Sequence, residues 1–146
     1  MPLRTGEQYL ASLRDGRTVY MLGQRVEDVT THPVLGVCAR HSALEFDLAQ
    51  DPALADLTRA ALETTGETVS RFYQLPRTPE DLLKRRDLIE HGSQVGLSMP
   101  LFIKEIGSDS LNALHIVCEA LDRDRGTTYS ARVAAYRAYC ATNDLA

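Results

Sequence analysis

The amino-acid sequence predicts one mainly α-helical domain of about five helices with one small β-hairpin near its start. Two observations predict the helices: capping residues begin the segments 5–8 and 78–81, and apolar residues recur at spacings of three and four after Gly107. A third predicts the hairpin, because a strand-like run at 18–21 is followed at once by a turn at Gly23. The length of 146 residues suits a single domain.

The first helix and the hairpin are predicted from local signals. Thr5 and Gln8 have the capping-box spacing, so a helix is expected over about residues 6–13. The run at 18–21 is expected to form a strand that turns into a second strand at 25–26. Such a hairpin is marginal alone and needs other elements to cover it.

The second helix is expected to begin at the Thr-His-Pro run of residues 31–33, with Pro33 in its first turn, and to end near Gln50. Residues 51–52 then start a short helical or irregular segment, and residues 67–73 alternate as an extended segment does. The helical period of this second helix is carried by Val34, Leu35, Cys38, Ser42, Leu44 and Leu48.

The third long helix is expected to begin at Pro79, because Thr78 is a good cap and two acidic residues follow at the positive end of the helix dipole. The basic run of residues 84–86 is expected to lie mostly on its solvent side. The residues expected to face inward are Leu82, Leu83 and Ile89.

Two further helices are expected after Gly107. Residues 123–126 interrupt the helical pattern, and Thr127 or Thr128 can cap the last helix. The apolar stripe of the first of these helices consists of Leu111, Leu114, Val117, Cys118 and Leu121. One face of the last helix carries Tyr129, Val133, Tyr136 and Cys140.

The composition excludes several classes of function. A formal net charge of −4 without a basic stripe argues against nucleic acid and anionic membranes as partners. No run approaches the roughly 18 apolar residues of a membrane span, and the N-terminus lacks the apolar region of a signal peptide, so a cytoplasmic protein is expected. The three cysteines, Cys38, Cys118 and Cys140, form no C-x-x-C pair and are expected to be reduced packing residues.

Several single residues could carry chemistry, but each has a structural interpretation. Cys38 and His41 have a ligand-like spacing, yet no further ligands lie nearby, so no metal site is expected. His32 is expected in a turn, and His115 at the edge of the core. The basic run at 84–86 could grip a phosphate or a coenzyme A tail, but it is expected to be solvated.

The aromatic residues and the nucleotide motifs leave the function open. Tyr129, Tyr136 and Tyr139 could stack on a flavin, although tyrosines at helical spacing are more often core residues with their hydroxyl groups at the rim. No dinucleotide fingerprint, P-loop or nucleophile elbow is present. The residues taken alone therefore do not determine a reaction.

The long pattern of residues 5–33, TGEQYLASLRDGRTVYMLGQRVEDVTTHP, resembles the N-terminal segment of the 4-hydroxyphenylacetate 3-hydroxylase family. That family comprises the large components of reduced-flavin-dependent aromatic hydroxylases and includes the 4-hydroxybutyryl-CoA dehydratases. The similarity continues at residues 71–72, 78–82, 107–113, 126–129 and 143–145.

The resemblance implies a fold and a function. The fold is the N-terminal helical domain of an acyl-CoA-dehydrogenase-like architecture, formed by residues 1–146 as a single domain, with the middle β-domain and C-terminal helix bundle of the family absent. The implied function is to form one wall of the substrate and flavin pocket of a monooxygenase that uses reduced FAD. The chain alone is expected to be inactive, because the family places a catalytic histidine and most flavin contacts beyond the matching segment.

The implied partners are the remaining domains or a partner subunit, a flavin reductase component, and a small aromatic or acyl substrate, with a homo-oligomer expected for a complete protein. Two alternatives remain open. One is a non-catalytic, stand-alone domain that binds a partner subunit, and the other is an enzyme like 4-hydroxybutyryl-CoA dehydratase.

Few of the family's functional residues can be matched to residues of this sequence. Ser108 and Asn112 stand where the aromatic hydroxylases have an arginine and a tyrosine, and with His115 they are the candidate substrate-pocket residues. A hydroxyl group cannot replace the charge of a guanidinium, so the usual phenol chemistry is not expected. The dehydratases have cluster-binding cysteines in the segment matching residues 101–105, where this chain has none, so no iron–sulfur cluster is expected.

Overall fold

A computed structural model describes residues 3–97 and 103–145. The described segments are mainly helical, and the two sheets among them each have two strands. In chain order the elements are α1 (Gly6–Ser12), β1 (Val19–Met21), β2 (Gln24–Val26), α2 (Leu35–Leu48), the 3-10 turn η1 (Pro52–Leu54), α3 (Ala55–Thr58), β3 (Arg59–Ala61), β4 (Thr68–Ser70), the 3-10 turn η2 (Arg71–Tyr73), α4 (Pro79–Val95), α5 (Glu105–Arg125) and α6 (Tyr129–Thr142).

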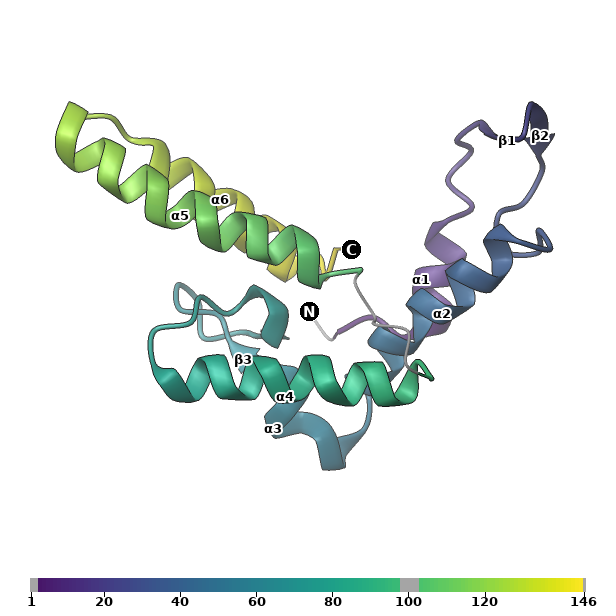
Figure 1. The fold of residues 1–146 in the computed structure, drawn as a ribbon, viewed down its shortest axis with the longest axis horizontal. Coiled ribbons are helices and arrows are strands. Elements are labelled where there is room, and N and C mark those ends of the chain that lie inside the picture. The colour runs from purple at the N-terminus through teal and green to yellow at the C-terminus, as the bar shows by residue number, and fades with distance from the viewer. Residues whose placement is uncertain (1–2, 98–102, 146) are drawn as a thin grey trace.

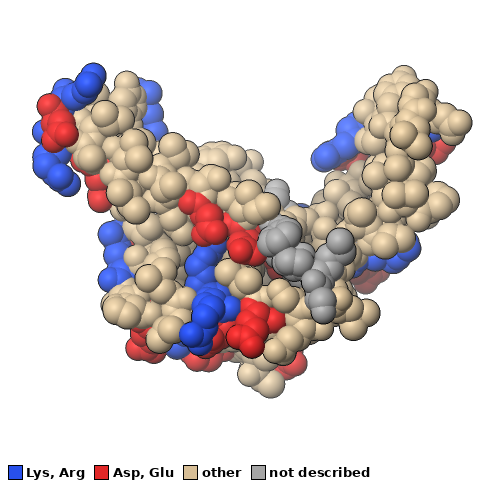
Figure 2. Space-filling model, in the orientation of Figure 1, with Lys and Arg blue, Asp and Glu red and all other residues tan. Residues whose placement is uncertain are grey.

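The helices form a V with two arms and a base (Figure 1). One arm is the antiparallel pair α5 and α6, and the other is the pair α1 and α2 with the β1–β2 hairpin at its tip. Helices α3 and α4 lie at the base. Figure 2 shows acidic and basic residues interleaved over this base, without an extended patch of one sign on that face.

The capping box predicted at Thr5 and the cap residue predicted at Thr78 are both confirmed, and Thr78 also forms a capping box. The Thr5 hydroxyl accepts a hydrogen bond from the backbone N–H of Gln8, whose side chain accepts one from the Thr5 N–H. Thr78 and Asp81 do the same at the start of α4. These signals are local, and they therefore position helix starts independently of tertiary packing.

The start of α2 differs from the prediction. The helix begins at Leu35, so Pro33 lies before it and not in its first turn. Instead, Nδ1 of His32 accepts hydrogen bonds from the N–H groups of Val34 and Leu35, both at 3.2 Å. His32 thus satisfies donors that a helix start leaves unpaired, which is the turn role expected for it.

A second hairpin, β3–β4, was not predicted. Arg59 pairs with Ser70 and Ala61 with Thr68 in an antiparallel register. The segment predicted as extended at 67–73 is divided, because β4 ends at Ser70 and η2 follows. The Arg-Ala-Ala sequence of β3 has no strand signal of its own, and its conformation depends on pairing with β4.

The core has two parts. One joins the second hairpin to the α5–α6 pair and contains Leu62, Val69, Tyr73, Leu111, Cys140 and Ala141. The other joins α1 to α2 through Tyr9, Ala43 and Phe46, in which the rings of Tyr9 and Phe46 stack with centroids 4.6 Å apart.

Helix α4 turns a different face inward from the one predicted. Leu82 and Leu83 are 58% and 50% exposed, whereas Leu88 and Arg85 are buried. The solvated position predicted for Arg85 is therefore wrong. Because its guanidinium finds oxygen acceptors and the Phe72 ring inside the protein, the charge is tolerated there.

The apolar stripe predicted for α5 is only partly buried. Leu111 and Cys118 are buried, but Leu114 and Val117 are about half exposed. On α6, Cys140 is buried, whereas Tyr129 and Tyr136 are 44% and 57% exposed.

Two smaller expectations are also corrected. Cys38 is exposed and is therefore not a packing residue, unlike Cys118 and Cys140. The side chains of Thr127 and Thr128 do not cap α6; the Asp122 carboxylate accepts the N–H groups of Tyr129 and Ser130, at 2.8 and 2.9 Å.

Candidate functional site

One turn of α5, residues 108–112, is held from α4 by a buried arginine. Nη2 of Arg85 donates to the Ser108 hydroxyl at 2.9 Å and to Asp109 Oδ1 at 2.6 Å, and Nη1 donates to the carbonyl oxygen of Phe72 at 3.1 Å. The charge of Arg85 is thus paired with a carboxylate and its donors are satisfied.

The same turn is held from α6 by a second buried arginine. Nη1 of Arg137 donates to Asn112 Oδ1 at 2.7 Å, and Nη2 donates to the carbonyl oxygen of Leu111 at 2.9 Å. A guanidinium has donors only, so the atom it holds must be the amide oxygen. The amide NH₂ of Asn112 is therefore left for other partners.

A cavity of about 650 Å³ lies between the start of α4 and α5. Asn112 and His115 line it, and so do Arg85 and Asp109. Its other walls are formed by Leu75, Pro76, Arg77, Thr78, Pro79, Leu82, Ile116 and Glu119. The cavity thus combines an apolar rim with a few convergent polar groups, as ligand sites do.

The charges around this cavity are balanced in pairs. Arg85 is 2.6 Å from Asp109, and Arg77 is 3.2 Å from Glu63. Nε2 of His115 is 3.1 Å from Glu119 Oε1, but the pair lacks hydrogen-bond geometry, so this buried nitrogen has no hydrogen-bond partner among the described residues.

The three candidate pocket residues are therefore not equivalent. Asn112 and His115 line the cavity, whereas Ser108 is 1% exposed and lies behind it. The Ser108 hydroxyl donates to the carbonyl oxygen of Glu105 and accepts from Arg85, so it supports the turn from inside.

Sequence reasoning missed Arg85 and Arg137. Arg85 lies three residues before the buried Leu88, and Arg137 lies between Val133 and Cys140 at spacings of four and three. These spacings place both arginines on the inward faces of their helices. This periodicity was the available signal, but a basic residue on such a face is unusual enough to be read as solvated.

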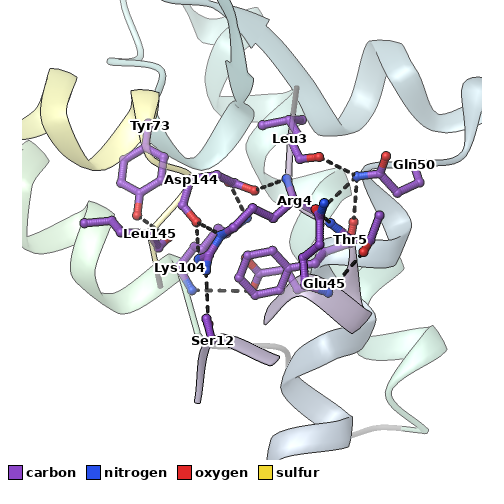
Figure 3. Close-up of polar contacts among 12 residues, drawn as sticks. Leu3, Arg4, Thr5, Ser12, Glu45, Gln50, Tyr73, Lys104, Asp144 and Leu145 are labelled. Carbon is purple, nitrogen blue, oxygen red and sulfur yellow. Dashed lines mark hydrogen bonds and ion pairs between the residues drawn. The ribbon is translucent and has the colours of Figure 1, made fainter. Parts of the chain in front are cut away.

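A second polar cluster joins the two ends of the chain (Figure 3). Lys104 and Asp144 form an ion pair at 2.7 Å, and both side chains are at least 96% buried. Asp144 also accepts a hydrogen bond from the Arg4 backbone N–H at 3.0 Å. Lys104 Nζ lies 3.9 Å from the centre of the Phe46 ring. Burial raises the pKa of the neighbouring Glu45 to about 7, although Lys104 opposes the shift.

Among residues 3–97 and 103–145, no group of three or more His, Cys, Asp or Glu side chains is arranged to hold a metal ion. Likewise, within that part of the chain no helix has the length and apolar character to cross a bilayer.

The fold is that of the N-terminal helical domains of acyl-CoA-dehydrogenase-like proteins. The chain belongs to the 4-hydroxyphenylacetate 3-hydroxylase family, whose N-terminal sequence profile matches residues 5–146.

Two curated relatives come from different branches of the family. The 4-hydroxybutyryl-CoA dehydratase/vinylacetyl-CoA-Δ-isomerase of Clostridium aminobutyricum is 34% identical over 98% of this chain and 29% of its own length. The 4-hydroxyphenylacetate 3-monooxygenase oxygenase component of Klebsiella oxytoca is 37% identical over 62% of this chain and 18% of its own length.

Two solved structures share the fold. An oxygen-tolerant 4-hydroxybutyryl-CoA dehydratase from N. maritimus has a TM-score of 0.87 at 26% identity, covering 97% of this chain and 28% of that chain. The oxygenase component of 4-hydroxyphenylacetate 3-monooxygenase, complexed with FAD and 4-hydroxyphenylacetate, has a TM-score of 0.72 at 25% identity, covering 98% and 29%. This chain thus spans less than a third of the length of these relatives.

Proposed function

We propose that this chain forms the N-terminal part of the oxygenase component of a flavin-dependent monooxygenase. In this role it contributes one wall of the pocket for the substrate and reduced FAD and is inactive alone. The observation that carries the proposal is the cavity lined by Asn112 and His115, since these are two of the three residues that the family resemblance suggests for the substrate pocket.

The residues of the cavity support substrate binding and not flavin binding by this chain. Its basic residues, Arg77, Arg85 and His115, each already lie within ion-pair distance of a carboxylate, so they do not offer a free charge to a pyrophosphate. We therefore assign the flavin contacts to other parts of a longer protein.

Within the cavity, Asn112 and His115 would bind and orient a small aromatic or acyl substrate. The NH₂ group of Asn112 supplies a donor whose direction is fixed by Arg137. Arg85 and Arg137 act through the α5 turn and are positioning residues. The absence of an arginine at position 108 favours a substrate other than the phenols of the named hydroxylases.

The remaining domains or a partner subunit would cover the outer surface of the α5–α6 arm. Seven large apolar residues of α5 and α6 are between 44% and 69% exposed: Ile106, Leu114, Ile116, Val117, Tyr129, Tyr136 and Tyr139. Exposed apolar surface of this kind is typical of an interface. A flavin reductase component and assembly of several copies belong to the same proposal, as does a cytoplasmic location.

The test begins with the intact mass of the protein isolated from its native source. A mass several times the 16.2 kDa of this chain, together with oxygen-dependent hydroxylation of an added aromatic substrate when reduced FAD is supplied, supports the proposal. A mass of 16.2 kDa would contradict it and favour the stand-alone domain that binds a partner subunit.

The dehydratase branch is the second candidate, because the dehydratase of C. aminobutyricum matches 98% of this chain. It would require another set of cluster ligands, since the segment 101–105 contains no cysteine. Iron analysis and the visible absorption of the purified native protein distinguish the two candidates, because only a dehydratase of this kind requires an iron–sulfur chromophore.

A further inference from the structure

A second, smaller cavity lies beside the first. It has a volume of about 110 Å³ and is lined by residues of the second hairpin, the segment before α4, α5 and α6. Leu75, Arg77 and His115 line both cavities, so the two are neighbours with a shared wall. The second cavity is distinct in having Arg137 in its lining.

Arg137 is a buried cation that forms no close ion pair among the described residues, although the more distant Glu63 carboxylate favours its charged form. It is 6% exposed, and no carboxylate of the described chain lies within 4.0 Å of its guanidinium. The buried cations Arg85 and Lys104, in contrast, have carboxylates at 2.6 and 2.7 Å. Burial lowers the pKa of Arg137 from its usual value, as expected for a charge removed from water.

The hydrogen bonds of Arg137 are also incomplete. Arg71, another buried arginine without a carboxylate partner, donates to four neutral oxygen atoms from all three of its nitrogen atoms. Arg137 donates to two, on Asn112 and Leu111, and its Nε has no partner in the described part of the chain. A guanidinium has five N–H donors, so Arg137 retains donors for an acceptor in the cavity it lines.

The rest of the lining selects the kind of acceptor. Glu63 and Arg77 both line the cavity and form an ion pair at 3.2 Å, and Nε2 of His115 lies 3.1 Å from Glu119. Among the described lining residues, Arg137 is therefore the cation without a carboxylate within 4.0 Å. Leu62, Ala134 and Ala138 supply apolar wall. A cavity of about 110 Å³ has room for a molecule of only a few non-hydrogen atoms.

We propose that this second cavity binds the carboxylate of a small aliphatic acid, held by the unused N–H groups of Arg137, with its tail against Ala134 and Ala138. A carboxylate matches the planar fork of a guanidinium, which makes it a better partner than a neutral amide. The site requires neither flavin nor a further domain, so its test does not depend on the function proposed above.

The test uses the 146-residue chain and propionate as the probe. Sodium propionate is titrated at constant ionic strength against sodium chloride, and binding is followed by the thermal unfolding midpoint and by the ¹³C-carboxyl NMR signal of the probe. With propionate, we expect the unfolding midpoint to rise to a plateau and the ¹³C-carboxyl signal of the probe to broaden. With propionamide, its neutral isostere, we expect no saturable rise of the midpoint and no binding.

Two variants on α6 distinguish the cavity from the surface. Ala134→Leu fills the cavity without removing a hydrogen bond, and we expect it to weaken propionate binding at least tenfold. Ala135→Leu, at the neighbouring exposed position outside the lining, is expected to bind as the unmodified chain does. Arg137→Lys, which keeps the charge but loses the fork, is expected to weaken binding as well.

Three results would overturn the assignment. They are the absence of a saturable propionate effect, an equal effect of propionamide, and unchanged propionate affinity in a folded Ala134→Leu variant. The third result is independent of any loss of stability caused by changing Arg137, because Ala134→Leu leaves that residue intact.

Discussion

Arg85 shows how the surroundings of a single residue decide its role. It belongs to a run of three basic residues, yet it is buried whereas Arg86 is exposed. The difference arises because Arg85 reaches Ser108 and Asp109 on α5 and the Phe72 carbonyl oxygen in η2. None of these partners is near Arg85 in sequence, so the run itself cannot distinguish the three residues.

Replacing Arg85 should therefore cost far more stability than replacing its neighbour. We expect Arg85→Lys to lower the free energy of unfolding by about 2–3 kcal/mol, because an ammonium cannot reproduce the forked contacts. The control Arg86→Lys should change it by less than about 0.5 kcal/mol. Urea unfolding measures both, and equal effects would contradict a special role for Arg85.

Glu45 should give the protein a pH-dependent stability. Its pKa is raised from 4.5 to about 7 by burial, so between these pH values the native state binds more protons than the unfolded state. The free energy of unfolding should therefore fall as pH rises through this window, by up to about 3 kcal/mol, and stay low above it.

The variant Glu45→Gln removes this titration. We expect it to be more stable than the unmodified chain at pH 8 and to lose most of the decline between pH 5 and pH 8. Glu90→Gln, at an exposed position of α4, serves as the control. Denaturant unfolding at both pH values checks the prediction, and an unchanged decline in Glu45→Gln would refute it.

Among the elements, α6 depends on a cap from the preceding helix. Asp122 accepts hydrogen bonds from the N–H groups of Tyr129 and Ser130 and from the Thr127 hydroxyl, and bonds from Ser130 and Thr127 hold its pKa below the usual range. We expect Asp122→Ala to lower the thermal midpoint by about 3 °C.

Thr128 provides the matched comparison, since it is the N-terminal boundary residue of α6 but makes no side-chain cap. Thr128→Ala should leave the midpoint almost unchanged. A larger loss in Thr128→Ala than in Asp122→Ala would show that the cap is assigned to the wrong residue.

The elements that could be predicted from the sequence are those with local signals. Thr5 and Thr78 mark their helices because the capping bonds span three residues. The hairpin at Gly23 was predictable for the same reason, with its left-handed φ of 77°. Strand β3 was not, because Ala60 pairs with Val69 across a turn and has no strand preference of its own.

At the scale of the whole molecule, the apolar stripe of α5 was predicted correctly from its spacing, but its residues are less buried than predicted. Leu114 and Val117 satisfy the periodicity of a buried face, and they remain about half exposed in this chain. For the candidate site, Asn112 and His115 could be predicted as cavity residues, whereas the inward position of Ser108 depends on Arg85 from another helix.

The exposed apolar side chains of the α5–α6 arm should bind an apolar dye. We expect the 146-residue chain to enhance ANS fluorescence, and the double change Val117→Lys with Tyr139→Lys to reduce the enhancement at least twofold without lowering the unfolding midpoint appreciably. Ala135→Lys on the exposed part of α6 is the control for added charge. Unchanged fluorescence in the double variant would place the dye elsewhere.

The pairing of Lys104 with Asp144 also sets an order of events during protein synthesis. Lys104 leaves the ribosome 40 residues before its counter-ion, and Arg4 emerges 140 residues before the Asp144 group to which it bonds. Until that late segment is translated, Lys104 lacks the carboxylate that makes its burial favourable. The α1–α2 arm can form early, but its junction with α5 must wait until Asp144 has been synthesised, so nascent chains that end before residue 144 should remain open to proteases at this junction.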